Sequence, residues 1–276
     1  FLINDDIGIH LPFIKENKIE GYELRPDQKK LVDKACQEQR GILISPTRTG
    51  KTIVSGANLI DYGWNKSNSE WLWGAYLIDE QQTSYASFFS HIDPYFGGYA
   101  GLGGFKNIST LLYDHMSATD YRKEAWFISV NASNPRVGQK FSGWGEWTND
   151  YLYMRAGEMY IIEAEAKARI AGQESAAKQV LTTYMLTRDP NYDISSLTGT
   201  AVLNEILLQR RIELWGEGQR FLDLKRLNLP LDRANLGHNS TNWGTAGYYA
   251  AGAKEFTWLI PQSELDANSS MVQNPL

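Results

Sequence analysis

Two consecutive helical patterns, residues 148–172 and 173–189, constrain the fold of this chain more than any other feature. The first ends at a glycine, and Asn149 or Asp150 is placed to cap its start. The second stops before Pro190, which cannot continue a helix. Small residues recur along the first pattern and allow other helices to pack closely against it. We therefore predict an antiparallel helical hairpin of the tetratricopeptide kind.

Further patterns on either side complete a mainly α fold with long loops and short strands. Residues 201–215 predict a third helix, and residues 219–227 predict a shorter one after a Gly-Glu-Gly interruption. Residues 71–78 predict a strand, and residues 93–106 predict a loop rich in glycine and aromatic residues. The closing segment, residues 260–268, resembles a capped turn that leads into an extended exit.

Composition excludes several classes of protein. Hydrophobic residues make up 42% and charged residues 21%, which is an ordinary globular mix, and the net charge of −5 disfavours a general nucleic-acid-binding surface. Cys36 is the single cysteine, so no internal disulfide forms, and it lies in a helical pattern where we expect it to be buried.

No apolar run approaches the roughly 20 residues that cross a bilayer. The chain starts without Met, and we expect a fragment or a processed product.

The histidines are scattered and give no metal-ligand spacing. They lie at positions 10, 91, 115 and 238. A transition-metal site needs ligands that the fold brings together, and its usual sequence signature is close spacing. We therefore expect neither a metal nor a cofactor.

Residues 45–52, Ser-Pro-Thr-Arg-Thr-Gly-Lys-Thr, resemble a Walker A loop between a strand and a helix. In such a loop Gly50 and Lys51 would hold phosphates and Thr52 would hold Mg²⁺. With the preceding helix, residues 20–52 resemble the opening of a superfamily 2 DNA or RNA helicase, in which Gln28 would contact adenine. This is the alternative function: a fragment of an ATP-dependent helicase.

The helicase hypothesis lacks its other parts. Asp79 lies in a segment that superficially resembles the acidic motif of a helicase. It is only 28 residues beyond Lys51, which leaves no room for the strands and helices that separate the two motifs in a helicase. No second lobe with arginine fingers follows. We expect no ATP turnover, and we expect Asp79 and Glu80 to form a solvated strand end.

Charged residues gather on the predicted helices and invite a catalytic interpretation. The set is Arg155, Glu158, Glu163, Arg210, Arg211, Glu213, Glu217, Arg220, Asp223 and Arg226. These residues stand among apolar positions, with opposite signs spaced for pairing, as in Glu165 and Arg169. Charges on packed faces must be paired, so we predict a structural network that holds the helices together.

The candidate ligand site is the glycine-aromatic stretch from His91 to Phe105. Aromatic residues make up 12% of the chain, and rigid amphipathic rings suit stacking against sugars as well as a core. The candidate binding residues are Asp93, Tyr95, Phe96, Tyr99 and Asn107. Burial of the rings in the core is an equally weighted alternative. Trp144 and Trp147 are weaker candidates, for which core packing is favoured.

Four segments carry a family resemblance, and their order and spacing agree. They are ATDYRKEAWF (118–127), DYLYMRAGEMYIIEAEAKARIAG (150–172), LNEILLQRRIELWGEGQRFLDLKRL (203–227) and IPQSELDANSSMVQNPL (260–276). Together they resemble the SusD/RagB family over about residues 55–276. We therefore predict a helicase-like fragment at 1–55, of foreign or fused origin, and a SusD/RagB-like domain at 56–276.

The resemblance implies a non-catalytic function. Members of that family are lipoproteins on the outer face of Bacteroidetes-type outer membranes. They capture glycans or other nutrients and cover a SusC-like TonB-dependent transporter. Their fold is mostly helical, with tetratricopeptide-like hairpins in the first half. We expect this chain to lack that half and the lipid-bearing cysteine. The resemblance implies an oligosaccharide or other nutrient as ligand, that transporter as partner, and no nucleic acid.

Overall fold

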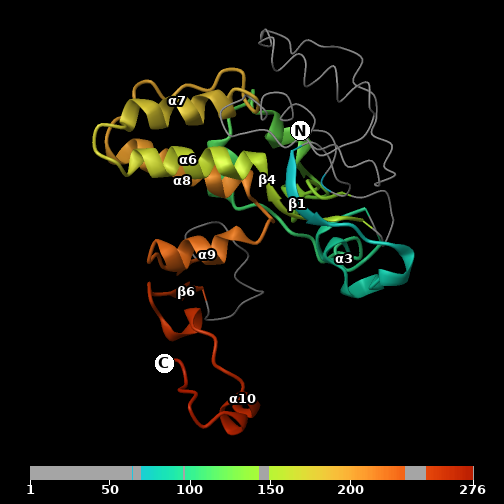
Figure 1. Cartoon of the computed structure of the whole chain (residues 1–276). Helices are drawn as coiled ribbons and strands as arrows, with labels where there is room; N and C mark the ends of the chain where they lie inside the picture. The colour runs from blue at the N-terminus through green and yellow to red at the C-terminus, as the bar shows by residue number, and fades with distance from the viewer. Residues whose placement is uncertain (1–63, 65–69, 96, 143–148, 234–246, 276) are drawn as a thin grey trace, which may run out of the picture. The chain divides into compact units, whose positions relative to one another are not determined.

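Figure 1 shows the computed structural model of the chain, which describes residues 64, 70–95, 97–142, 149–233 and 247–275. The chain divides into two compact units. One holds the chain up to Ile108 and His115–Arg210, and the other holds Ser109–Asp114 and Arg211–Leu276. The predicted boundary near residue 55 lies outside the described residues and stays a prediction.

In its described residues, the first unit combines three long helices with short strands. Its elements are β1 (Trp71–Ala75), η1 (Asp79–Gln81), η2 (Ser84–Ala86), α3 (Phe88–Ile92), α5 (Tyr121–Ala125), β2 (Phe127–Ile128), β3 (Val137–Gly138), β4 (Tyr151–Arg155), α6 (Ala156–Ala168), α7 (Glu174–Met185) and α8 (Thr200–Glu213), whose last three residues belong to the second unit. The predicted mainly α fold with short strands is confirmed for the described residues.

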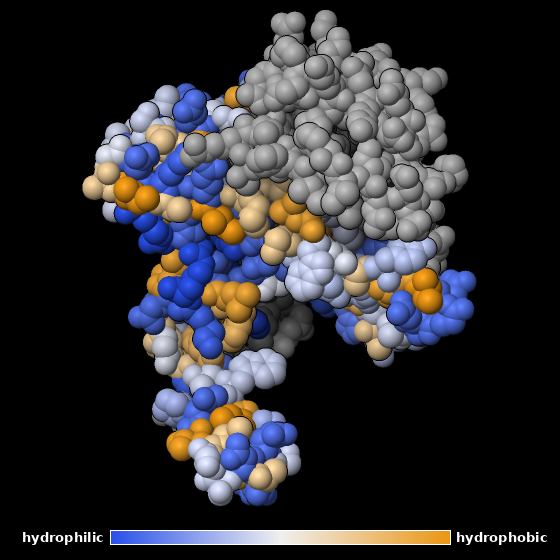
Figure 2. Space-filling model, viewed as in Figure 1, coloured by the Kyte–Doolittle hydropathy of each residue, from blue (hydrophilic) through white to orange (hydrophobic). Residues whose placement is uncertain are grey.

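The predicted helical hairpin is confirmed, and a third helix completes its core. Figure 1 shows α6 and α7 side by side, with α8 against α6. Their shared core is apolar and fully or almost fully buried; it consists of Ile161, Ala164, Ala177, Leu181, Tyr184, Met185, Ile194, Val202 and Ile206. Each buried aliphatic side chain stabilises the fold by about 1.5–3 kcal/mol. Figure 2 shows hydrophilic and hydrophobic residues interspersed over the visible face of α6 and α7.

The start of the first predicted helix is wrong, because residues 151–155 form a strand. β4 pairs antiparallel with β1, which places Trp71 opposite Arg155 and Ala75 opposite Tyr151. Asn149 and Asp150 are therefore not helix caps. Both are buried, and Asp150 Oδ1 accepts a hydrogen bond from Leu77 N at 3.2 Å.

Glu70 fixes the point at which strand β4 becomes helix α6. Its carboxylate lies 3.1 Å from Arg155 Nη1 and accepts a hydrogen bond from Gly157 N at 3.1 Å. Its main-chain oxygen accepts from Ala156 N at 2.9 Å. A carboxylate that accepts from the first N–H groups of a helix complements the positive end of the helix dipole. The cap of α6 thus comes from a residue 87 positions before Gly157 in the chain.

A second cluster of the first unit surrounds a buried lysine with rings. Lys140 Nζ lies 4.2 Å from the ring centroid of Trp64 and 4.4 Å from that of Trp126. Trp64 also packs edge-on against Trp126 and Phe141, with centroids 5.5 and 5.6 Å apart. Cation–π attraction is strongest where water is excluded, so this cluster supports the loops around β2 and β3.

The second unit consists, in its described residues, of short helices and short strands. It holds most of α4 (Thr110–His115), α9 (Gln219–Arg226), β5 (Leu231–Asp232), β6 (Tyr248–Tyr249), η4 (Lys254–Phe256) and α10 (Gln262–Ala267). Phe221 and Phe256 stack with centroids 5.9 Å apart, which joins α9 to η4. The predicted short helix after Gly-Glu-Gly is confirmed as α9, and the predicted capped turn contains α10.

Candidate functional site

The glycine-aromatic loop after α3 is anchored by main-chain contacts. Ala100 N donates to Ser90 O at 2.8 Å, and Tyr99 N donates to Ser90 Oγ at 3.2 Å. A Cβ atom on Gly98 would lie 2.6 Å from Ser90 Cα, so only glycine allows this approach. Gly97 has a φ of +73°, the left-handed region that glycine adopts without strain. The loop is therefore held closely against α3.

Both candidate tyrosines of this loop point to the surface. Tyr95 is 63% exposed and Tyr99 is 53% exposed, so the alternative in which both rings lie in the core is excluded. Tyr99 packs edge-on against Tyr85 with centroids 5.3 Å apart, and its ring lies 5.0 Å from that of His91. The sequence prediction named neither Tyr85 nor His91 as a ligand contact.

The Tyr95 hydroxyl is oriented by an amide from a distant part of the chain. It donates to Gln139 Oε1 at 3.0 Å, and Gln139 Nε2 donates to the main-chain oxygens of Glu124 and Ala125 at 3.2 and 3.1 Å. Partial burial and the nearby Asp93 carboxylate raise the pKa of Tyr95, so its hydroxyl stays protonated at physiological pH. Gln139 has no local sequence signal, because it reaches Tyr95 across 44 residues.

Asn107 lies at the exposed end of the loop, among other amides. Its Nδ2 donates to Asn134 Oδ1 at 3.1 Å, and its backbone bridges to Val137. The main chain continues this pairing, since Gly138 N donates to Lys106 O at 2.8 Å. Residues 131–139 therefore border the loop and add hydrogen-bonding groups that the sequence prediction missed.

Asp93 does not belong to the exposed surface, contrary to its predicted place among the binding residues. It is completely buried, and its carboxylate accepts a hydrogen bond from Tyr95 N at 2.9 Å. An aspartate that accepts from the N–H two residues ahead forms a local turn. Asp93 shapes the loop and is inaccessible to a ligand.

Several predicted residues lie outside the described residues. They are Phe96 of the loop, Trp144 and Trp147, and the nucleotide-binding candidates Gln28, Gly50, Lys51 and Thr52. Asp79 and Glu80 are exposed in η1, which agrees with the expected solvated position.

Part of the charged set forms ion pairs of the predicted structural kind. Arg210 pairs with Glu158 at 3.2 Å, and Arg169 pairs with Glu165 at 2.8 Å. Lys167 pairs with Glu163 at 2.8 Å, and Arg226 pairs with Asp223 at 2.7 Å. These ion pairs connect residues within or between helices.

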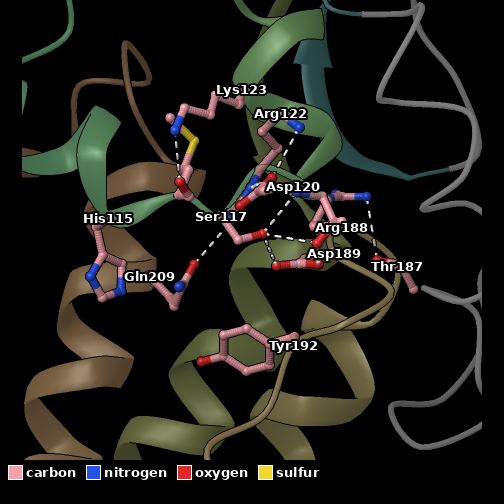
Figure 3. A network of polar contacts seen from close by, with 12 residues as sticks. His115, Ser117, Asp120, Arg122, Lys123, Thr187, Arg188, Asp189, Tyr192 and Gln209 are labelled. Carbon is pink, nitrogen blue, oxygen red and sulfur yellow. Dashed lines mark hydrogen bonds and ion pairs between the residues drawn. The ribbon is translucent and has the colours of Figure 1, made fainter.

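Figure 3 shows a network of polar contacts in the first unit, around the Asp120-Tyr-Arg122 element. Arg122 donates to Asp120 through Nε and Nη2, at 3.0 and 2.6 Å, and to Gln209 Oε1 at 2.8 Å. Asp189 accepts from the hydroxyls of Ser117 and Thr119, each at 2.6 Å. Asp120, Arg122 and Asp189 are buried, so this cluster joins α5, α8 and the end of α7.

Among the described residues, no three His, Cys, Asp or Glu side chains gather closely enough to hold a metal ion. Nor does any helix in that part of the chain combine the length and apolarity needed to span a membrane.

Comparison with known proteins decides the family. The sequence matches the model of the SusD family over residues 113–276, more than half of the chain. The chain belongs to the SusD family. No curated protein sequence matches it. The family match includes the Asp120-Tyr-Arg122 element and the three carboxy-terminal segments, which confirms the resemblance drawn from these residues.

Solved structures confirm the SusD fold. The chain is similar to a SusD-like carbohydrate binding protein from Bacteroides vulgatus, with a TM-score of 0.60 and 20% identity over 89% of this chain and 55% of that one. It is also similar to a SusD superfamily protein from Bacteroides thetaiotaomicron, with a TM-score of 0.61 and 20% identity over 91% and 56%. The chain thus spans little more than half the length of these relatives. The helicase alternative gains no support from these comparisons.

Proposed function

We propose that the chain binds glycans without catalysis and delivers them to a SusC-like TonB-dependent transporter at the outer face of the outer membrane. The observation that carries this proposal is the exposure of Tyr95 and Tyr99 on one loop, with the Gln139 amide on the Tyr95 hydroxyl. The paired amides of Asn107 and Asn134 lie at the end of the same loop. We call these five residues the tyrosine platform.

The chemistry of the tyrosine platform suits a sugar. A sugar ring offers a face of C–H groups that an aromatic ring can cover, while its hydroxyls need donors and acceptors at the edge. Each amide supplies both a donor and an acceptor. The Tyr95 hydroxyl, held by Gln139 at 3.0 Å, adds a positioned acceptor lone pair.

The burial of the acidic residue in this loop, Asp93, is consistent with a non-catalytic function. Glycoside hydrolysis uses two carboxyl groups that flank the bond, about 5–10 Å apart. The carboxylate within the loop, that of Asp93, is buried and engaged with Tyr95 N. The platform therefore offers stacking and hydrogen bonding rather than acid–base chemistry.

The names of similar proteins support a glycan as the ligand. The Bacteroides vulgatus relative is named as a carbohydrate binding protein, and a further similar structure is surface glycan-binding protein A from Bacteroides uniformis, with a TM-score of 0.50 and 20% identity over 83% of this chain and 57% of that one. Membership of the SusD family supports the transporter partner and the membrane location, which form part of the proposal.

Replacement of both platform tyrosines by Ala tests the proposal. We expect Tyr95→Ala/Tyr99→Ala to weaken binding of the best oligosaccharide from a screen by about 1–3 kcal/mol, or roughly 5–150-fold in Kd. Because both rings are exposed, Tm should change little. Isothermal titration calorimetry measures the affinity, and thermal unfolding measures the stability.

The matched control is Tyr121→Ala, because Tyr121 is 51% exposed and lies in α5, outside the platform. It should leave the Kd unchanged. An unchanged Kd for the double variant would reject the platform as the site. Release of shorter sugars from the bound oligosaccharide would reject the non-catalytic function.

A further inference from the structure

The Gln139 amide group beside the tyrosine platform is held in one orientation. Its Nε2 donates to the main-chain oxygens of Glu124 and Ala125, at 3.2 and 3.1 Å. Carbonyl oxygens accept and cannot donate, so the two protons of the amide point at them. Gln139 N also donates to Trp126 O at 2.8 Å, which holds the main chain at the same place. The amide oxygen, Oε1, is therefore the atom that faces Tyr95.

This orientation determines where the proton of the Tyr95 hydroxyl lies. An amide oxygen is only an acceptor, so the hydroxyl donates its single proton to Gln139 Oε1, at 3.0 Å. A lone pair remains on Tyr95 Oη, and Gln139 Oε1 keeps a second lone pair of its own. Tyr95 is 63% exposed, and its bond to Gln139 lies at the surface. These two side chains therefore present acceptors to a bound molecule at this edge, and no donor.

A sugar meets this edge differently according to its substituents. A free sugar hydroxyl donates its proton into the lone pair on Tyr95 Oη. An O-methyl or O-acetyl group at the same position has lost that proton, so an oxygen without a proton would face the lone pair. The Tyr95 hydroxyl can turn to donate to such a group only by giving up its bond to Gln139. The contact therefore favours the free hydroxyl.

We propose that Gln139 is a positioning residue that makes the tyrosine platform selective for glycans with a free hydroxyl at Tyr95, against glycans alkylated or acylated there. This role of Gln139 rests on the proposed glycan-binding function and deepens it, since it states which chemical form of a sugar the platform selects. The place of the hydroxyl proton leaves the ring faces of Tyr95 and Tyr99 unchanged. Stacking therefore supplies affinity, and the oriented hydroxyl supplies selectivity.

Mono-O-methyl derivatives of one oligosaccharide test the role of Gln139 with the full chain. The parent compound is the tightest binder in an array of neutral oligosaccharides, and each derivative blocks one hydroxyl. Selectivity is the ratio of the Kd of a derivative to the Kd of the parent, both from isothermal titration calorimetry. For the unchanged chain, we expect at least one derivative with a ratio of about five or more, the scale of one net hydrogen bond.

Two variants and a control show whether this ratio depends on the oriented hydroxyl. Gln139→Leu releases the Tyr95 hydroxyl, which can then donate to the methylated oxygen, so the ratio should fall by about threefold or more. Tyr95→Phe keeps the exposed ring and removes the hydroxyl, and it should lower the ratio of the same derivative. The bulk of the methyl group is the same in every protein and cancels in the comparison. Gln179→Leu, at an exposed position of α7, is the matched control and should leave every ratio unchanged.

The outcomes distinguish a positioning role from a structural one. If Gln139 only satisfies the carbonyls at the end of α5, Gln139→Leu should lower Tm and weaken the parent and the derivatives alike. Unchanged ratios in that variant would overturn the positioning role and leave glycan binding standing. The same conclusion follows if Tyr95→Phe keeps the ratio of the unchanged chain, and this variant decides alone if Gln139→Leu does not fold.

The parent compound separates this role from the proposed function. If the unchanged chain binds every derivative as tightly as the parent, the selectivity is overturned and glycan binding stands. If no oligosaccharide of the array binds the unchanged chain, the proposed function is rejected, and the role of Gln139 with it.

Discussion

At the scale of single residues, three hydrogen-bond donors converge on the carboxylate of Glu205. Tyr192 Oη and Gln209 Nε2 each donate to Oε1 at 2.9 Å, and His115 Nε2 lies 3.1 Å from Oε2. Burial by itself would raise the pKa of Glu205, but the hydrogen bonds from His115, Gln209 and Tyr192 outweigh it and lower the pKa. The ionised form is therefore the one that the fold stabilises.

A lowered pKa gives a stability that depends on pH with a defined sign. The contribution of Glu205 is present above the pKa of an unfolded glutamate, about 4.3, and is lost as pH falls through the lower folded value. We expect Glu205→Gln to lower Tm at pH 7. The glutamine side chain would place an N–H donor where a carboxylate oxygen now accepts from Tyr192, Gln209 or His115. The difference from the unchanged chain should shrink between pH 5 and 3. Thermal unfolding by circular dichroism measures it.

Glu163→Gln is the control for this prediction. Glu163 pairs with Lys167 at 2.8 Å on a more exposed face of α6, where such a pair contributes about 0.5 kcal/mol or less. Its effect on Tm should be small throughout the pH range. A Glu205→Gln variant as stable as the unchanged chain at pH 7, or a difference that stays constant with pH, would contradict the account.

At the scale of elements, the start of α6 shows why sequence patterns misplace a boundary. Residues 148–172 have a continuous helical pattern, but α6 ends at Ala168, before the predicted end at Gly172. The following helix, α7, is predicted correctly. The strand at Tyr151–Arg155 depends on pairing with β1, about 80 residues earlier, and on the Glu70 carboxylate. No local pattern contains these long-range contacts, which override intrinsic helix propensity.

Gly157 provides a test of this junction. A helix interior ordinarily favours Ala over Gly by about 1 kcal/mol. Here a Cβ atom would clash with Tyr184 Oη, with Arg155 Nη1 and, at 2.8 Å, with Glu70 Oε1. We therefore expect Gly157→Ala to destabilise the fold by about 1–3 kcal/mol, the cost of overpacking. Denaturant unfolding measures the free energy.

Ile162→Ala is a control on the same helix, because Ile162 is largely exposed. Its free energy of unfolding should change by about 0.5 kcal/mol or less. If Gly157→Ala proved stabilising, as helix propensity alone predicts, the closely packed junction around Glu70 would be contradicted.

At the scale of the whole molecule, the sequence predicts the scaffold and three of the five residues of the proposed tyrosine platform. Glycine and aromatic spacing locates an exposed loop, and the exposure of Tyr95 and Tyr99 is confirmed. Gln139 and Asn134 could not be predicted, since they reach the loop from 44 and 27 residues away. Asp93 was misassigned because an aspartate that closes a buried turn looks the same in sequence as one that meets a ligand.

The central claim is that the tyrosine platform binds a glycan, and a crystal structure of the chain with its best oligosaccharide tests it most directly. The account predicts a sugar ring over Tyr99 or Tyr95, with hydroxyls in hydrogen-bond distance of Asn107, Asn134 or Gln139. Asp93 should remain buried beneath the loop. A sugar bound only at another surface, with both tyrosine rings uncovered, would contradict the account.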